Sequence, residues 1–284
     1  GKISWDTQLV ASDVDGRSGY GFLSDLSWNP KRGVGHNFSL DFLDDELDVS
    51  DLGFLRRNDY VGAKYRFFRS TSRGLPDWLR NRRIGIYSQV YQNTDGLLME
   101  SYLGVMATWL TKKNLELAAN FNIKPQHYDD RNSRGNGIYR KDTGFYSALS
   151  VGTNSAKKFA FSAMLQGRAE DLGDVTYVTT LGFTYSPVDR FSVDLDLVLN
   201  KRNEWLVYRG DKDFTSYDAL EVQPNLSIDF FISAKQQLRF KLQWAGIDAD
   251  ESHFWSVPDA VGDLVPRYRD LEDPSENFTV SRLT

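Results

Sequence analysis

Hydrophobic and polar residues alternate along this chain, segment after segment, with a period of two. The clearest example is residues 191–199, where every odd-numbered position is apolar and Ser192, Asp194 and Asp196 occupy even-numbered positions. A period of two places successive side chains on opposite faces of a β-strand. The pattern therefore predicts an all-β protein whose strands have one apolar face and one polar face.

The alternation recurs about thirteen times, from a first strand near residues 2–12 to one around residues 238–244. Residues 278–283 resemble the start of a fourteenth strand. Most of these strands reach the roughly nine to eleven residues that cross a bilayer, whereas soluble strands average about five or six. We therefore predict an antiparallel transmembrane β-barrel of about 13–14 strands. The alternative is a soluble sandwich, propeller or long flat sheet, which would pack its apolar faces together. Pro224 predicts a bulge or a late start in the twelfth strand.

The connections between strands differ in length in a regular way. Short ones follow the sixth, eighth, tenth and twelfth strands, at 111–114, 154–158, 186–190 and 233–237. Long polar ones lie near 44–58, 125–143, 200–219 and 246–275. Short turns at one end and long loops at the other are typical of outer-membrane barrels. The insertion at 69–82 and the short loops at 13–18 and 93–96 depart from this pattern.

An odd number of strands does not close a single-chain bacterial barrel, and lipid does not tolerate an open sheet edge. We therefore expect residues 1–284 to be a single barrel domain that is an incomplete part of a larger even-stranded barrel. Truncation is expected at the C-terminus. Because the first residues already have the pattern of a strand, we also expect either that a signal peptide was removed or that the chain is a piece of a longer protein.

Composition excludes several classes of protein. The net charge of −5 argues against non-specific nucleic-acid binding, which requires a basic face. The absence of cysteine excludes disulfides and thiolate metal sites. The sequence contains no run of about 18 apolar residues, so no membrane helix is predicted. The aromatic content of 14% fits aromatic girdles at two membrane interfaces, although strand-rich soluble proteins are also rich in aromatic residues.

Two segments concentrate paired charges: residues 51–59 (DLGFLRRND) and residues 128–135 (YDDRNSRG). The candidate site residues in them are Asp51, Arg56, Arg57, Asp59, Asp129, Asp130, Arg131 and Arg134. The favoured interpretation is that they form salt bridges that fold loops over the barrel mouth. The alternative is a binding ledge for an anionic or sugar ligand, because arginine forks suit carboxylate and phosphate.

These two segments resemble a family of bacterial outer-membrane proteins. In that family, an N-terminal module like carbohydrate-binding family 9 precedes a C-terminal barrel domain of unknown function (DUF5916-like). Residues 265–271 (VPRYRDL) also resemble the family's approach to its last strands. The resemblance covers nearly the whole chain, all within the barrel half. It implies an outer-membrane barrel, with carbohydrate binding in a module that these 284 residues lack.

No motif predicts catalysis, a cofactor or a metal site. His36, His127 and His253 are scattered and lack metal-ligand spacing. The acidic runs at 41–51 and 248–253 are interpreted as solvated loops, although the first contains enough carboxylates to hold Ca²⁺. Some outer-membrane barrels are enzymes with Ser, His and acidic residues at the rim, and geometry rather than spacing identifies such sites. The sequence favours a role without catalysis.

Two functions are therefore expected. The first is an outer-membrane barrel that serves as pore, transporter or surface scaffold, associated with carbohydrate binding or uptake in the full-length protein. The second is the membrane anchor of a surface carbohydrate-active hydrolase or binding protein. The expected location is the cell outer membrane. The expected partners are outer-membrane lipid and lipopolysaccharide, with polysaccharide or another outer-membrane protein as further candidates, and no nucleic acid.

Overall fold

A single large antiparallel β-sheet forms almost the whole structure, a computed structural model that describes residues 1–49, 57–233, 235–268 and 276–284. Its strands are β1 (Lys2–Val14), β2 (Arg17–Lys31), β3 (Val34–Leu43), β4 (Tyr60–Thr71), β5 (Leu79–Gln92), β6 (Tyr102–Thr111), β7 (Glu116–Lys124), β10 (Gly144–Gly152), β11 (Phe159–Ala169), β12 (Val175–Val188), β13 (Phe191–Gly210), β14 (Asp213–Ser233), β15 (Gln236–Ser256), β16 (Val265–Arg267) and β17 (Phe278–Leu283). The separate hairpin comprises β8 (His127–Asp129) and β9 (Tyr139–Lys141).

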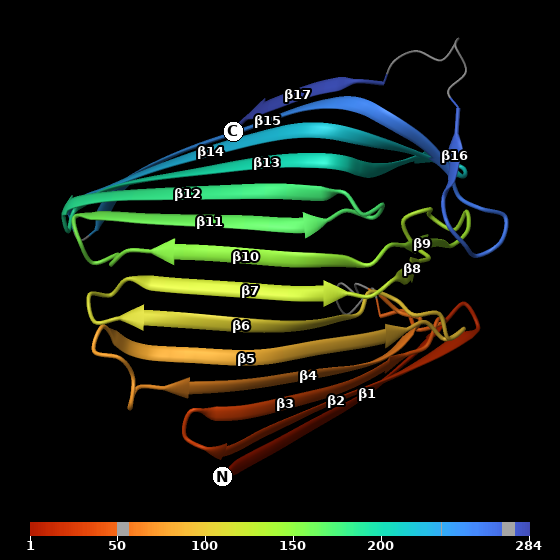
Figure 1. Cartoon of the computed structure of the whole chain (residues 1–284), viewed down its shortest axis with the longest axis horizontal. Coiled ribbons are helices and arrows are strands. Elements are labelled where there is room, and N and C mark those ends of the chain that lie inside the picture. Colours follow the sequence, from red (N-terminus) through yellow and green to blue (C-terminus); the bar gives the residue numbers. More distant parts are fainter. Residues whose placement is uncertain (50–56, 234, 269–275) are drawn as a thin grey trace.

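Each strand of the sheet pairs with its neighbour in the sequence, except that β7 pairs with β10 across the β8–β9 hairpin (Figure 1). At the far side β15 pairs with both β16 and β17. The predicted all-β antiparallel fold is confirmed. Within the described residues the sheet does not close on itself, so closure into a barrel stays a prediction. None of the described residues forms a helix long and apolar enough to cross a membrane.

All thirteen predicted strands are present, but two predicted loops are wrong. Residues 200–219 belong mostly to β13 and β14, which meet in a tight turn at Asp211 and Lys212. The acidic segment 248–253 lies inside β15 rather than in a loop. The alternation was obscured there because bulges interrupt it, between Arg202 and Trp205 in β13 and opposite Ser216 in β15.

Pro224 causes neither a bulge nor a late strand start. It pairs in register with Leu197 on β13, and β14 begins eleven residues earlier, at Asp213. The pairs on either side, Val222 with Gly246 and Asn225 with Gln243, share one register with β15. A proline lacks only one ladder donor, and here the missing N–H leaves a local gap in pairing without shifting the strands.

The connections lie at two opposite edges of the sheet, as Figure 1 shows. One edge, here the turn edge, carries the short turns at 32–33, 112–115, 153–158 and 189–190, together with residues 72–78. The other, here the loop edge, carries the segments at 44–49, 57–59, 93–101, 125–143, 170–174 and 257–264. This separation follows the predicted alternation of short and long connections.

One face of the sheet is apolar from strand to strand. A single row of paired residues runs through Trp28, His36, Phe67, Ile86, Val105 and Phe121, from β2 to β7. These apolar side chains are unusually exposed: Phe121 and Ile123 are 48% and 46% exposed, while Asn122 between them on the opposite face is only 8% exposed. The usual relation between polarity and burial is therefore reversed.

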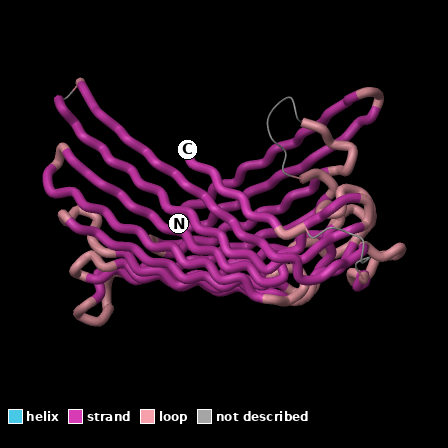
Figure 2. Tube along the Cα trace, turned by 90° about the horizontal axis from the view of Figure 1, so that it is seen from above, coloured by secondary structure: helices cyan, strands magenta, loops and turns pink. Residues whose placement is uncertain are grey.

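The polar face lies on the inner side of the sheet's curve. Figure 2 shows a trough in which the outermost strands bend toward the same side. On the polar face, side chains reach across an intervening strand: Tyr91 donates to Asp41 (3.3 Å), and Asn122 donates to Tyr87 (3.1 Å). Such contacts require a face whose side chains converge, so we infer that the polar face is concave and the apolar face convex.

Candidate functional site

The segments predicted to carry a charged site meet at the loop edge. Arg57 donates two parallel hydrogen bonds to Asp130, from Nη1 to Oδ1 (2.9 Å) and from Nη2 to Oδ2 (2.5 Å). Both side chains are largely buried. Paired, bidentate contacts of this kind are among the stronger and more directional ion pairs in proteins. The contact joins two segments that are 73 residues apart in the sequence.

Lys141 links the β8–β9 hairpin to the loop that follows β11. Its Nζ lies 2.7 Å from Asp129 Oδ2 and 3.1 Å from Asp171 Oδ1. Burial opposes the charged form of Lys141, but the two carboxylates outweigh it and raise the pKa of the amine. Burial likewise opposes ionised Asp129, yet Lys141 and the backbone N–H groups of Arg131 and Asn132 hold its pKa below the ordinary value.

The remaining described candidates have separate partners. Arg131 donates through Nη2 to the backbone and side-chain oxygens of Asn58 (3.2 and 2.7 Å). Asp59 accepts from the backbone N–H and the hydroxyl of Thr94 (2.9 and 2.5 Å). The Arg134 guanidinium lies 5.3 Å from the ring centre of Tyr208. Asp51 and Arg56 lie outside the described residues.

These contacts define the loop-edge cluster: Arg57, Asn58, Asp129, Asp130, Arg131, Lys141 and Asp171. A cavity of about 200 Å³ lies beside it, lined by charges of both signs that include Glu100 and Lys124. Since the Arg57 fork is occupied by Asp130, the arrangement matches ion pairs that hold loops together. Ligand binding at this cluster stays a prediction.

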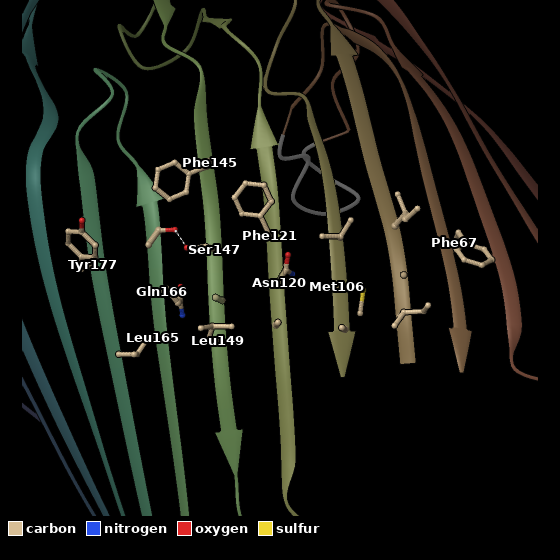
Figure 3. A pocket seen from close by; sticks show the side chains of 18 residues that line it. Phe67, Met106, Asn120, Phe121, Phe145, Ser147, Leu149, Leu165, Gln166 and Tyr177 are labelled. Carbon is tan, nitrogen blue, oxygen red and sulfur yellow. Dashed lines mark hydrogen bonds between the residues drawn. The ribbon is translucent and has the colours of Figure 1, made fainter. Parts of the chain in front are cut away.

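A second feature is a groove of about 750 Å³ on the apolar face (Figure 3). Small residues of neighbouring strands form its floor, among them Ala107, Ala119 and Gly167. The larger lining side chains are Phe67, Phe121, Phe145, Leu149, Leu165 and Tyr177. The groove crosses several strands and is lined mostly by hydrocarbon, so its surface suits an apolar occupant.

Sequence reasoning missed a second polar cluster, formed by Glu204, Ser216, Ser252 and His253. Its members fall in segments 200–219 and 246–275, both predicted as loops, and no spacing motif joins them. They meet because two bulges lie opposite neighbouring positions of β14. A sequence signal was present only in the interruption of the alternation near residues 203 and 252.

With this geometry in hand, comparison with known proteins identifies the family. The model of the family described as "Domain of unknown function (DUF5916)" matches residues 2–281. The chain belongs to this family. Comparisons with curated proteins and with solved structures return no match. The resemblance seen in the sequence is thus confirmed for the β-rich DUF5916 domain, while the N-terminal carbohydrate-binding module and the outer-membrane setting are still predictions.

Proposed function

We propose that this DUF5916 domain forms the wall of an outer-membrane β-barrel, with its apolar face toward lipid and its polar face toward a hydrated interior. The observation that carries the proposal is the reversed exposure of the two faces. Side chains such as Ile3, Leu9 and Leu149 are more than 60% exposed on the apolar face. Exposing so much apolar surface to water is unfavourable in proportion to its area, and lipid removes that cost.

The groove on the apolar face supports the same setting. In water, its hydrocarbon lining would favour association with another apolar surface. A lipid acyl chain matches its chemistry and lies alongside a membrane-spanning sheet. The groove therefore needs no protein partner in this setting.

The polar face supports a passage with charges of both signs. Charged side chains of both signs lie on this face or at its loop edge, and several are paired: Lys64 with Asp41 (3.0 Å), Lys124 with Glu100 (2.5 Å), and Arg239 with Asp229 (2.6 Å). Charges balanced in this way favour a pore or transporter with little ion selectivity. The extensive pairing also favours the second candidate, a closed anchor for a surface carbohydrate-active protein.

Cysteine labelling tests the orientation of the sheet, because the chain contains no native cysteine. Phe121→Cys and Asn122→Cys place a fluorescent label on opposite faces of β7. With the chain reconstituted in vesicles, lipids carrying a quencher should quench the label at position 121 at least several-fold more than the label at 122. Leu149→Cys and Ser150→Cys repeat the comparison on β10. Equal quenching at both members of each pair would contradict the proposal.

Single-channel recording in planar bilayers separates the two candidates. A pore gives discrete conductance steps with similar permeability for K⁺ and Cl⁻. If the domain is an anchor, lipid quenches the labels at positions 121 and 149, but no conductance steps appear.

A further inference from the structure

The sharpest local distortion of the sheet lies where two bulges face each other across β14. One is in β13, between Arg202 and Trp205, and the other is in β15, opposite Ser216. Glu204, in the first bulge, has a φ of 51°, in the left-handed region that residues other than glycine seldom adopt. Bulges and residues held in such conformations are enriched at functional sites.

The distortion turns four side chains toward one another. The Glu204 carboxylate, only 15% exposed, accepts hydrogen bonds from the hydroxyls of Ser216 and Ser252. His253 Nδ1 lies 2.9 Å from Glu204 Oε1. A carboxylate accepts from the N–H of an imidazole, so the proton is on Nδ1 and Nε2 is the basic nitrogen. His253 is 65% exposed, which leaves that nitrogen accessible.

Both serine hydroxyls donate hydrogen bonds to the Glu204 carboxylate. Ser216 is fully buried, and besides donating to Glu204 its oxygen accepts from the His253 backbone N–H (3.2 Å) and Trp255 Nε1 (3.3 Å). Ser252 also directs its hydroxyl to Glu204, and its oxygen lies 2.9 Å from His253 Nδ1, where it accepts from the protonated nitrogen. Since neither hydroxyl donates to the imidazole, neither is set to be a nucleophile activated by His253. We therefore expect His253 to activate a water molecule at its Nε2.

The cluster lies at the border of the apolar band. β14 alternates without interruption between Leu220, which is 51% exposed on the apolar face, and Ser216, so both point to the same side. Beyond Ser216 on that side, Phe214 is buried beneath Tyr139, Val257 and Leu264. Four residues of strand span about 13 Å. With the usual tilt of roughly 45°, that is about 9 Å of depth, comparable to the headgroup layer of a bilayer.

We propose that Glu204 and His253 form a hydrolytic site for an ester presented at the membrane surface, such as the acyl ester of a lipid. The position of the site rests on the proposed membrane setting; the base itself does not. His253 Nε2 takes a proton from water as the water oxygen bonds to the ester carbonyl carbon. When the tetrahedral intermediate collapses, the bond to the alcohol oxygen breaks and the imidazolium returns the proton to the leaving alkoxide. The products are a carboxylic acid and an alcohol.

Two carboxylates lie beside this base. Glu204 on β13 contacts the ring, and Asp218 on β14 accepts from the Glu204 backbone N–H (3.0 Å). Glu251, two residues before His253, pairs with Tyr217 on the opposite face of the sheet. The negative charges stabilise the imidazolium that forms as the water is deprotonated. Glu204 is thus a positioning residue, and His253 is the catalytic residue.

The test uses the full chain and two esters. One is the water-soluble p-nitrophenyl butyrate, and the other is phosphatidylethanolamine in vesicles, followed by release of fatty acid. His253→Gln should lower both rates at least 100-fold, as general-base removal commonly does. The matched control is His36→Gln, a histidine that contacts Tyr65, Trp28 and Phe67, which should leave both rates unchanged. Glu204→Gln should lower kcat for both esters, and Glu204→Asp, which keeps the carboxylate, should restore part of it.

If wild type hydrolyses the soluble ester and His253→Gln does not, the result supports His253 as the general base. If the labelling experiment also finds no lipid-facing side, only the proposed membrane setting is wrong. Release of fatty acid from vesicles supports the interfacial position as well. Rates in wild type equal to those of His253→Gln for both esters would overturn the site.

Discussion

At the residue scale, the loop edge depends on a few buried charges whose partners come from distant segments. Lys141 is the most constrained, because both of its carboxylate partners are largely buried with it. Removing one partner of a buried ion pair leaves the others uncompensated. Exposed ion pairs such as Lys212 with Asp259 contribute much less. The two lysines therefore offer a matched comparison.

Lys141→Met should destabilise the folded chain by about 3 kcal/mol, because Asp129 and Asp171 would then face each other without a cation. Lys212→Met should leave the stability close to that of wild type, because solvent screens this exposed pair. Urea unfolding of the reconstituted chain, followed by tryptophan fluorescence, measures both. Equal effects of the two substitutions would show that burial of the Lys141 pairs does not matter.

The same pairs make the loop edge sensitive to extremes of pH. The lowered pKa of Asp129 gives stabilisation that is complete above the ordinary aspartate pKa of about 3.9 and is lost as the pH falls through the lower folded value. The raised pKa of Lys141 gives stabilisation that is complete below about pH 10.4 and is lost as the pH rises through the higher folded value. Pepsin should therefore cleave within 125–143 only well below pH 4, whereas Lys141→Met should already be cleaved at pH 4. Cleavage of wild type at pH 5 would contradict this assignment.

At the element scale, the strands approach closely on the polar face because aromatic rings lie over glycines of neighbouring strands. A Cβ on Gly62 would lie 1.7 Å from Tyr91 Cδ1, and one on Gly104 would lie 2.4 Å from Tyr87 Cζ. The rings fill the space that side chains at these glycines would need. Cross-strand packing of this kind fixes register and helps a sheet to curve.

Gly62→Ala should lower stability by about 1–3 kcal/mol, the usual cost of inserting a group into packed space, because the Tyr91 ring must move. Gly152→Ala is the control: its Cβ would meet no atom within 4 Å, and its backbone is not in the left-handed region. The urea midpoints of the two variants, compared with wild type, give the result. A restored midpoint in the double variant Gly62→Ala with Tyr91→Leu would confirm that the clash is with the ring.

At the scale of the whole molecule, the long loops connect parts of the sheet that the strand order keeps apart. Arg57 and Asp130 join the first third of the sheet to the β8–β9 hairpin. Arg140 then donates two hydrogen bonds of 2.5 Å to Asp263, beyond β15, and its backbone N–H donates to Gly262. The hairpin is therefore a strap along the loop edge that holds the curvature of the sheet.

Chemical cross-linking checks this strap in the cysteine-free chain. Arg140→Cys with Asp263→Cys should be joined within one chain by a short bismaleimide, giving a shift in gel mobility. Arg140→Cys with Lys31→Cys, at opposite edges of the sheet, should not be joined. Equal yields of cross-linked product for the two pairs would contradict the proposed strap.

Much of this fold was predictable from the sequence, because alternation with a period of two is a local property. It gave all thirteen principal strands, the two faces of the sheet and the division into short and long connections. It failed at 200–219 and 248–253, where bulges break the period and polar residues occur on both faces. For the candidate site, the charge pattern pointed to two segments with opposite charges, but neither the pairing of Arg57 with Asp130 across 73 positions nor the role of Lys141 had a local signal.

The sequence by itself determined that each strand has an apolar and a polar side, since that depends only on residue spacing. Only the tertiary structure decided that the apolar side is the exposed one, because exposure depends on how the whole sheet curves. The same holds for Glu204 and His253, which lie 49 positions apart in the sequence. Their contact exists because the bulges of β13 and β15 lie opposite neighbouring residues of β14. That alignment depends on the register of three strands, which no single segment of the sequence specifies.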